Sequence, residues 1–299
     1  MPELSAGVES ITLPFRGWLI ELIHLGHGPL RRSGGLVPLE QLRIISLNLA
    51  RAAVLRGTSP KGYSSLFCSA SGAAPVRVDS RPIGADCCFV LGSRAPFDLY
   101  LPDSCRVLIV SRPVPGRSRA AFRSLSADHR AVLDRSMRLI DGYWRTATPD
   151  DAAATVRSRL NELLEPLAAS LIDESADLPE DYHKRSVRTS AVALARKYIQ
   201  AHVRHPIQLA DLCDAAGVGA RTLEYGFREH YDVGPMAYLR SVRLCLVRRD
   251  LASSKHAGRS VTGAARRWGF RHMGQFSRDY RKLFGEMPSA TLARATDIH

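Results

Sequence analysis

The chain has 299 residues, enough for two domains, because single hydrophobic cores usually stop growing at ~250–300 residues. Hydrophobic residues make up 45% and charged residues 24% of the chain, which is typical of a globular protein, and no apolar run approaches the ~20 residues that span a bilayer. The formal net charge is +13. Lys184–His299 has 21 Lys and Arg against 9 Asp and Glu, while residues 1–183 have 21 against 20. A last third this basic is typical of a domain that binds a polyanion, although charge alone also fits a solvated basic surface or a membrane-facing patch.

The cysteines indicate neither a zinc site nor a disulfide framework. They form no C-x-x-C pair and are widely spaced in a long chain, so we expect reduced thiols. The N-terminus has no basic region followed by an apolar core, so we predict a cytoplasmic protein with no membrane partner. The six are Cys68, Cys87, Cys88, Cys105, Cys213 and Cys245.

The first third has the pattern of short strands. Apolar runs are separated by turn-forming clusters such as GHGPLRRSGG and SGAAP, and this alternation predicts a β-barrel or sandwich. The stretch around RIISLNLARAAVLR also fits a helix. The predicted strands are WLIELIHL, QLRIISLNL, YSSLFCSA, CCFVLG, DLYLP and CRVLIVS.

Two amphipathic helices are predicted after a loop at Arg112–Ala120. The first has Val132, Met137 and Ile140 on one side, and the second has a leucine stripe running from Val156 to Leu171. Packing into the core and pairing with a second copy of the chain both explain these stripes. The acidic segment DESADLPEDYH, which begins at Asp173, is the predicted linker to the basic region.

The basic region contains an internal repeat. Four positions in the first copy recur 52 residues later, and two further positions recur 53 residues later, so the copies differ by one residue in a turn. The first group is Leu209, Cys213, Gly217 and Val218, matched by Val261, Ala265, Gly269 and Phe270; the second is Leu223 and Phe227, matched by Phe276 and Tyr280.

The sequence of each copy is typical of a helix-turn-helix unit. A short helix with a small residue at its crossing is followed by a glycine that permits a sharp turn, and then by a second helix. Apolar residues four apart in the second helix face the core together, so the opposite face is exposed. Arg, Gln and Glu on such a face can recognise the edges of bases. The predicted DNA-binding residues are Arg221, Thr222, Glu224, Tyr225 and Arg228 in the first copy, and His272, Met273, Gln275, Arg278 and Arg281 in the second.

A long helix is predicted between the two copies. It begins at Pro235, which suits a first helical turn, and no breaker interrupts it before Ala252. Its length of ~27 Å is comparable to the ~34 Å turn of B-DNA, so one chain can set two helices into successive major-groove segments. Arg240, Arg243, Arg248 and Arg249 on this helix are candidates for phosphate contacts, and Arg243 fits a structural role equally well.

The segments RTLEYGFREHYDVGPMAYLRSVRL and VTGAARRWGFRHMGQFSRDYRKLFGEMPSATL resemble the DNA-binding domain of the AraC family of transcription regulators, over roughly Ser190–Leu292. Within the family, the second segment is similar to the ethanolamine-utilisation regulators. The resemblance implies base contacts by Arg221, Glu224 and Tyr225, and by Met273, Gln275 and Arg278. Two glycines depart from the family pattern. Gly219 replaces a Ser or Thr N-cap, and Gly226 lies inside a helix at a cost of ~1 kcal/mol relative to Ala, so we expect the first unit to adapt more on DNA.

The resemblance also implies an N-terminal sensor with a cupin-like barrel. The expected fold is α+β, with a cupin-like effector-binding domain at residues 1–113, a helical connector at 114–172 that is a candidate for dimerisation, a linker at 173–183 and an all-α DNA-binding domain at 184–299. His24 and His27 have the wrong spacing for a cupin metal site, so we expect no metal and no cofactor.

No motif of an enzyme is found: a phosphate-binding glycine loop, H-E-x-x-H and G-x-S-x-G are all absent from the sequence. We therefore predict a sequence-specific, non-enzymatic transcription regulator that binds double-stranded DNA as a homodimer. A small effector is expected to control it, and contact with RNA polymerase is compatible with this role. Two alternatives stay open, a redox-responsive regulator acting through Cys87 and Cys88, and a nonspecific architectural DNA-binding protein.

Overall fold

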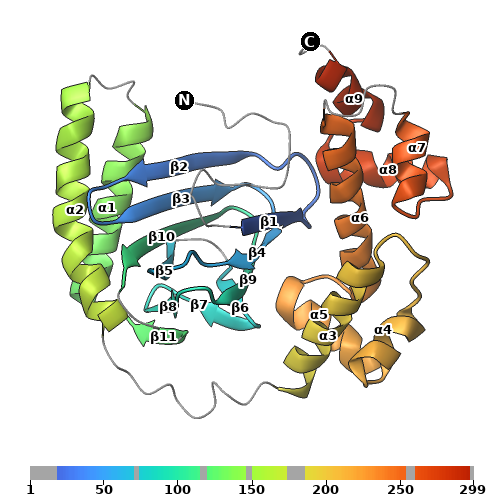
Figure 1. The fold of residues 1–299 in the computed structure, drawn as a ribbon, viewed down its shortest axis with the longest axis horizontal. Helices are drawn as coiled ribbons and strands as arrows, with labels where there is room; N and C mark the ends of the chain where they lie inside the picture. The colour runs from blue at the N-terminus through green and yellow to red at the C-terminus, as the bar shows by residue number, and fades with distance from the viewer. Residues whose placement is uncertain are drawn as a thin grey trace.

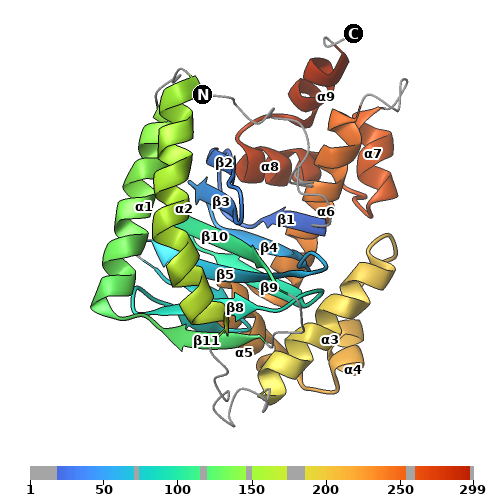
Figure 2. The ribbon, with the colours of Figure 1, turned by 60° about the vertical axis from the view of Figure 1, so that its left-hand side comes forward.

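The computed structural model describes residues 19–70, 74–114, 120–145, 150–173, 186–253 and 260–296. These residues form four layers: a helix pair, a six-stranded sheet, a five-stranded sheet and a helical C-terminal region (Figures 1 and 2). The predicted α+β fold, with a two-sheet β region before a helical region, is confirmed.

The two sheets are antiparallel in every pairing that the structure records. The five-stranded sheet has the order β1-β4-β9-β6-β7, and the six-stranded sheet has the order β11-β8-β5-β10-β3-β2. The strands are β1 (Leu19–His24), β2 (Arg32–Pro38), β3 (Arg43–Leu49), β4 (Ala53–Thr58), β5 (Tyr63–Ala70), β6 (Val76–Val78), β7 (Arg81–Ile83), β8 (Cys87–Leu91), β9 (Pro96–Leu101), β10 (Cys105–Pro113) and β11 (Ala121–Ser124).

Strands β3, β8 and β10 of the six-stranded sheet are buried on both faces along most of their length, which explains their continuous apolar runs in the sequence. Successive residues of β10 alternate between two cores: Val107 and Ile109 face the other sheet, while Leu108 and Val110 face the helix pair. Side chains between the sheets include Phe67, Phe89 and Phe97 among many aliphatic residues. This interior is therefore apolar.

Two strands differ from the expected pattern. The cluster GHGPLRRSGG was expected to be a turn, but Arg32–Gly35 belong to β2, which pairs with β3. Gly34 makes this possible, because it has a φ of +113° and a β-carbon there would lie 2.1 Å from the Ser46 carbonyl oxygen. The stretch that also fitted a helix, residues 43–56, forms β3 and the first part of β4 and contains no helix.

Nine named helices complete the described ranges. They are α1 (Ala127–Arg145), α2 (Asp150–Asp173), α3 (Val187–His202), α4 (Leu209–Ala216), α5 (Ala220–Tyr231), α6 (Pro235–Ala252), α7 (Val261–Arg267), α8 (Met273–Phe284) and α9 (Pro288–Thr296). The apolar stripes of α1 and α2 pack against the six-stranded sheet through residues such as Met137, Ile140, Leu160 and Leu164. Core packing thus accounts for both stripes.

Several predictions fall on residues outside the described ranges. The predicted linker after Asp173 lies there, and so do residues 115–119 of the predicted loop. Arg112 and Pro113 of that loop belong to β10. No helix among the described residues is long and apolar enough to cross a membrane.

Candidate nucleic-acid interface

The first repeat folds as α4, a tight turn and α5. Gly217 ends α4 in the left-handed conformation, with a φ of 65°, and the backbone N–H of Val218 donates to the Cys213 carbonyl at 3.2 Å. Leu223 and Phe227 on α5 are fully buried, as their spacing predicts. Gly219 begins α5 without a side-chain cap, which confirms the departure seen in the sequence.

The second repeat has the same construction. Gly269 has a φ of +86°, and the N–H of Phe270 donates to the Ala265 carbonyl at 3.0 Å, matching the bond from Val218 in the first copy. Phe276 and Tyr280 on α8 are buried. The repeat found in the sequence is therefore a repeat of backbone geometry.

Helix α6 joins the two repeats and has the predicted bounds. Its residues Tyr238, Leu239, Val242 and Val247 belong to one apolar core with both repeats, so the helix is held from several sides. Arg243 has a structural role: its Nε donates to the Val203 carbonyl at 3.0 Å and its Nη2 to the His205 carbonyl at 2.6 Å.

The outward face of α5 carries paired polar side chains. Tyr225 is 51% exposed, and Arg221 donates from Nη2 to its hydroxyl at 3.4 Å. Arg228 forms an ion pair of 3.0 Å with Glu224 one turn away. The hydrogen bond and the ion pair thus hold these side chains in place on the outward face of α5.

The outward face of α8 is organised around Gln275. The Gln275 amide Nε2 donates to Asp279 Oδ1 at 2.8 Å, and Arg278 Nη2 donates to Gln275 Oε1 at 2.8 Å. Asp279 also forms a 3.6 Å ion pair with Arg240 of α6. Gln275, Arg278 and Asp279, which lie within about one turn of α8, are thus linked to the helix that joins the repeats.

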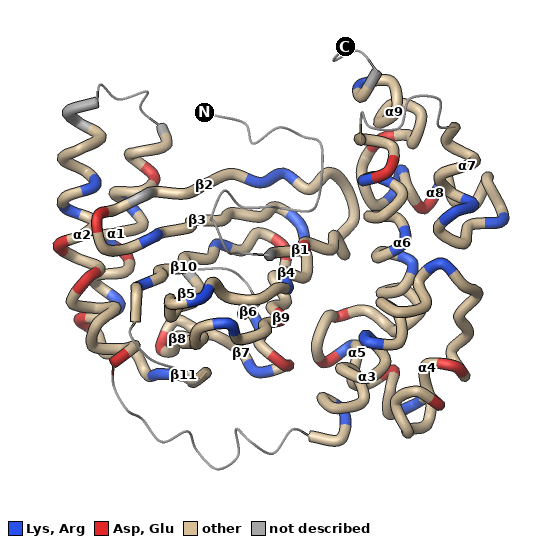
Figure 3. Tube along the Cα trace, in the orientation of Figure 1, with Lys and Arg blue, Asp and Glu red and all other residues tan. Residues whose placement is uncertain are grey.

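These faces belong to the basic part of the chain. Figure 3 shows Lys and Arg along α6, α7 and α8, where they exceed the acidic residues. Two separate helices that display Arg, Gln and Glu from one basic region can meet both the phosphates and the base edges of a duplex.

Comparison with known proteins supports this geometry. Residues 212–294 match a family model described as "Helix-turn-helix domain". This part of the chain is a helix-turn-helix domain. The match runs from α4 to α9, so the helix-turn-helix domain contains both repeats and α6.

Two curated relatives are transcription regulators by name. The "Probable thc operon regulatory protein" of Rhodococcus erythropolis is 35% identical over 111 residues, which cover 37% of this chain and 33% of that protein. The "XylDLEGF operon transcriptional activator 3" of Pseudomonas putida is 36% identical over 206 residues, 66% of this chain and 62% of that protein. The chain therefore spans between a third and just over three fifths of the length of these relatives.

A solved structure with a similar sequence is a probable AraC family transcriptional regulator from Rhodopseudomonas palustris. It is 38% identical, with a TM-score of 0.33, and the similarity covers 35% of this chain and 96% of that one.

The predicted DNA-binding residues lie on the surface of the helix-turn-helix domain to different degrees. Thr222, Glu224 and Met273 are half-buried, and Met273 packs against the core. The others are exposed, namely Arg221, Tyr225, Arg228, His272, Gln275, Arg278 and Arg281. Their contact with DNA stays a prediction.

Sequence reasoning missed Asp279, which connects Gln275 with Arg240. A signal was present, since residues four apart on a helix share a face and Gln275 and Asp279 have this spacing. Its partner Arg240 is a candidate for phosphate contact, and their ion pair joins residues that are 39 positions apart in the sequence.

Contacts of the five-stranded sheet with α3 and α5 were also missed. Asp98 of β9 is buried, forms an ion pair with Arg196 of α3 and accepts a hydrogen bond from the Tyr231 hydroxyl at 3.0 Å. Arg77 of β6 pairs with Asp232, the C-cap of α5, at 2.8 Å. The outer face of the sheet thus holds the end of α5.

The second repeat is held by the same sheet. The backbone N–H of Gly28 donates to the Lys282 carbonyl at 2.9 Å, and the His24 ring lies 5.8 Å from the Phe284 ring. His24 is buried in this contact, and its pKa is lowered to about 3, chiefly by burial and then by Arg248. Within the described ranges no three His, Cys, Asp or Glu residues are grouped as metal ligands.

Two cysteines of the sandwich, Cys68 and Cys87, have a raised pKa, which keeps their thiols protonated. Cys88 lies opposite Cys68 in the pairing of β5 with β8, and both are buried and free. Burial raises the pKa of the half-buried Cys87, and a hydrogen bond to Cys88 together with burial raises the pKa of Cys68. Thiols in this state are poor nucleophiles, which gives no support to the redox alternative.

Proposed function

We propose that the chain is a transcription regulator of the AraC type that reads DNA with α5 and α8. The observation that carries the proposal is the pair of matching helix-turn-helix units, whose outward faces carry Arg221, Glu224, Gln275 and Arg278 on either side of α6. Two units on a buried connecting helix suit two successive segments of the major groove. The relatives' names point to an activator of an operon.

The second part of the proposal is control by a small effector. The five-stranded sheet contacts both repeats, so a ligand that changes the sandwich also changes how the helix-turn-helix domain is held. The predicted homodimer and the contact with RNA polymerase belong to this proposal as well.

The DNA-reading role is tested with the full chain, its own upstream DNA and a scrambled duplex at two salt concentrations. We expect a preference of ~10³-fold or more for the native site, and a smaller preference for Arg221→Ala and Gln275→Ala. Arg159→Ala, on the exposed side of α2 at the opposite end of the molecule, is the control and keeps the preference (Figure 1). Equal binding of both duplexes by all variants contradicts the proposal.

The effector role is tested by melting the full chain with a metabolite panel. The panel includes ethanolamine with cobalamin, for the subgroup resemblance. We expect a compound that raises the melting temperature to change affinity for the native duplex too, because ligand binding and DNA binding are then linked. A compound that raises the melting temperature without changing DNA affinity argues against control by that compound.

A further inference from the structure

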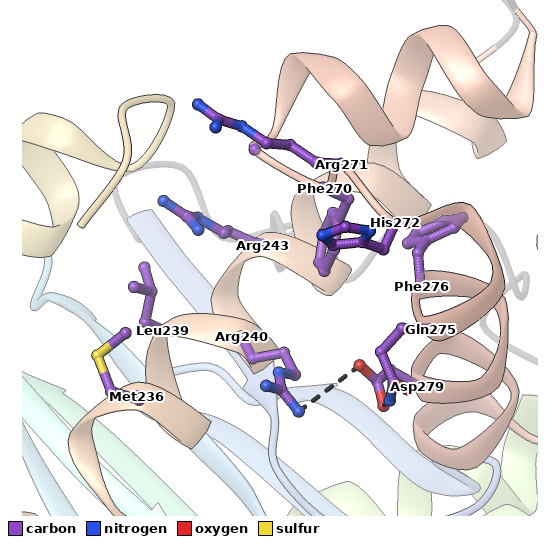
Figure 4. A pocket seen from close by; sticks show the side chains of 11 residues that line it. Met236, Leu239, Arg240, Arg243, Phe270, Arg271, His272, Gln275, Phe276 and Asp279 are labelled. Carbon is purple, nitrogen blue, oxygen red and sulfur yellow. Dashed lines mark hydrogen bonds and ion pairs between the residues drawn. The ribbon is translucent and has the colours of Figure 1, made fainter. Parts of the chain in front are cut away.

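A groove between α6 and α8 lies beside the exposed face of α8. It encloses about 290 Å³ and is lined by the first half of α6, the turn at Gly269 and the start of α8 (Figure 4). This volume is close to the ~300 Å³ lower bound of small-molecule sites. Its apolar wall is formed by Met236, Leu239, Phe270 and Phe276, and its polar groups include Arg240 and Arg271.

The charges in the groove favour an anion. Arg240, Arg243 and Arg271 line it, and Asp279 is the one carboxylate among the lining residues. Arg243 already donates to two backbone carbonyls. Arg240 differs, because its side chain is 57% exposed and its ion pair with Asp279 is 3.6 Å long. Exposed ion pairs contribute only ~0–1 kcal/mol, so an incoming anion can replace Asp279 as the partner of Arg240 at little cost.

The groove lies between the two outward faces that we propose read DNA. Glu224, in the first half of α5, covers Gly234, where a β-carbon would lie 2.5 Å from Glu224 Oε1. Gly234 is the N-cap of α6, whose first two turns carry Met236 and Arg240. Arg240 then reaches Asp279 on α8. The contacts that connect α5 to α8 through α6 therefore run along the groove.

We propose that this groove is a seat for one backbone phosphate of the duplex, with Arg240 as its ligand. A duplex whose major groove meets α5 and, further along, α8 must carry its sugar-phosphate backbone across the part of α6 between them. The arginine binds the phosphate, and the apolar wall with Met236 at its edge suits the carbons of deoxyribose. This inference rests on the proposed function and adds the contact that fixes the register between the two repeats.

The test uses the full chain and native duplexes in which one phosphate at a time is replaced by an uncharged methylphosphonate. For the wild type we expect a loss of affinity at one position between the two recognised segments. For Arg240→Ala we expect methylphosphonate at that position to cause no loss of affinity. The slope of log affinity against log salt concentration should also fall by about 1. Arg159→Ala on α2 is the matched control and keeps the wild-type profile. Melting temperatures establish that the variants are folded.

The outcomes separate this inference from the proposed function. If the wild type prefers its native site but Arg240→Ala keeps both the salt slope and the methylphosphonate profile, the groove does not bind a phosphate, and the proposed regulator function is unaffected. If native and scrambled duplexes bind alike while Arg240→Ala still lowers the salt slope, the groove binds a phosphate, and the proposed sequence-specific recognition is contradicted.

A second arm distinguishes DNA from a free anion. Inorganic phosphate is added at constant ionic strength to the wild type and to Arg240→Ala. We expect the same small effect on DNA binding in both proteins. Displacement of DNA at millimolar phosphate from the wild type alone assigns the groove to a free phosphate compound and overturns the backbone seat.

Discussion

At the scale of single residues, the hydrogen bonds of the Gln275 side chain orient its amide to recognise one kind of base. An amide has two acceptor lone pairs and two donor hydrogens, and Arg278 and Asp279 use one of each. One acceptor and one donor are left, and this is the pair that recognises the major-groove edge of adenine. Asp279 therefore acts as a positioning residue for Gln275.

Replacing Asp279 with Ala removes the acceptor that orients Gln275. We expect discrimination at one base position to fall by on the order of 1 kcal/mol, part of the ~1–3 kcal/mol that a bidentate base contact supplies. The measurement is the affinity for duplexes that carry each of the four bases at each operator position. A loss confined to one position indicates positioning of Gln275, whereas a uniform change indicates only backbone electrostatics.

Asp279→Asn is the conservative control, because asparagine keeps an oxygen acceptor for the Gln275 amide while losing the charge. It should retain the base preference of the wild type. Identical preferences in Asp279→Ala and the wild type would show that Gln275 needs no support from Asp279.

At the scale of helices, the sequence predicted much of the helix-turn-helix domain. The spacing of Leu223 and Phe227, and of Phe276 and Tyr280, located the buried faces, and Pro235 located the start of α6. Periodicity works here because helix faces depend on local spacing. It misjudged Gly226, whose role depends on α3: a β-carbon there would lie 2.9 Å from Val192 Cγ2.

Gly226 is thus a packing residue at the crossing of α3 and α5. Alanine normally stabilises a helix by ~1 kcal/mol relative to glycine, but overpacking costs ~1–3 kcal/mol. We expect Gly226→Ala to lower the free energy of unfolding, measured by denaturant titration. Gly274→Ala in α8 is the matched control, since no atom lies within 4 Å of the added carbon. Equal stabilisation by both substitutions would contradict close packing and restore the expectation of an adaptable first unit.

At the scale of the whole molecule, the sequence did not reveal how the sandwich meets the helix-turn-helix domain. Glu21, Arg56 and Asp98 alternate with apolar residues along β1, β4 and β9, a pattern typical of a strand with one solvated face. In the structure Asp98 instead contacts Arg196 and Tyr231. The partners are about 100 or more positions apart, so no local pattern can pair them, and the polar face of the sheet is an interdomain surface.

His24 makes this interdomain contact sensitive to acid. Its unfolded pKa is ~6.5, whereas its pKa in the folded chain is lowered to about 3, chiefly by burial and then by Arg248, with smaller effects of His27 and Arg51. Neither ring nitrogen has a hydrogen-bond partner among the described residues. The neutral ring is therefore the form that packs against Phe284.

The direction of the pH effect on stability follows from proton binding. Below pH ~6.5 the unfolded chain binds a proton at His24, whereas the folded chain does not. Stability from this residue is complete above pH ~6.5 and falls as the pH drops toward 3. Each pH unit lowers the free energy of unfolding by ~1.4 kcal/mol, so it falls by about 2 kcal/mol between pH 6.5 and 5.

We expect unfolding titrations of His24→Leu to lack this loss of stability, while His205→Ala, at an exposed position, retains it. His230, whose pKa is also lowered by burial, leaves a residual slope in all three proteins. Equal acid sensitivity in His24→Leu and the wild type would mean that the sandwich and the second repeat are held together by groups other than this histidine.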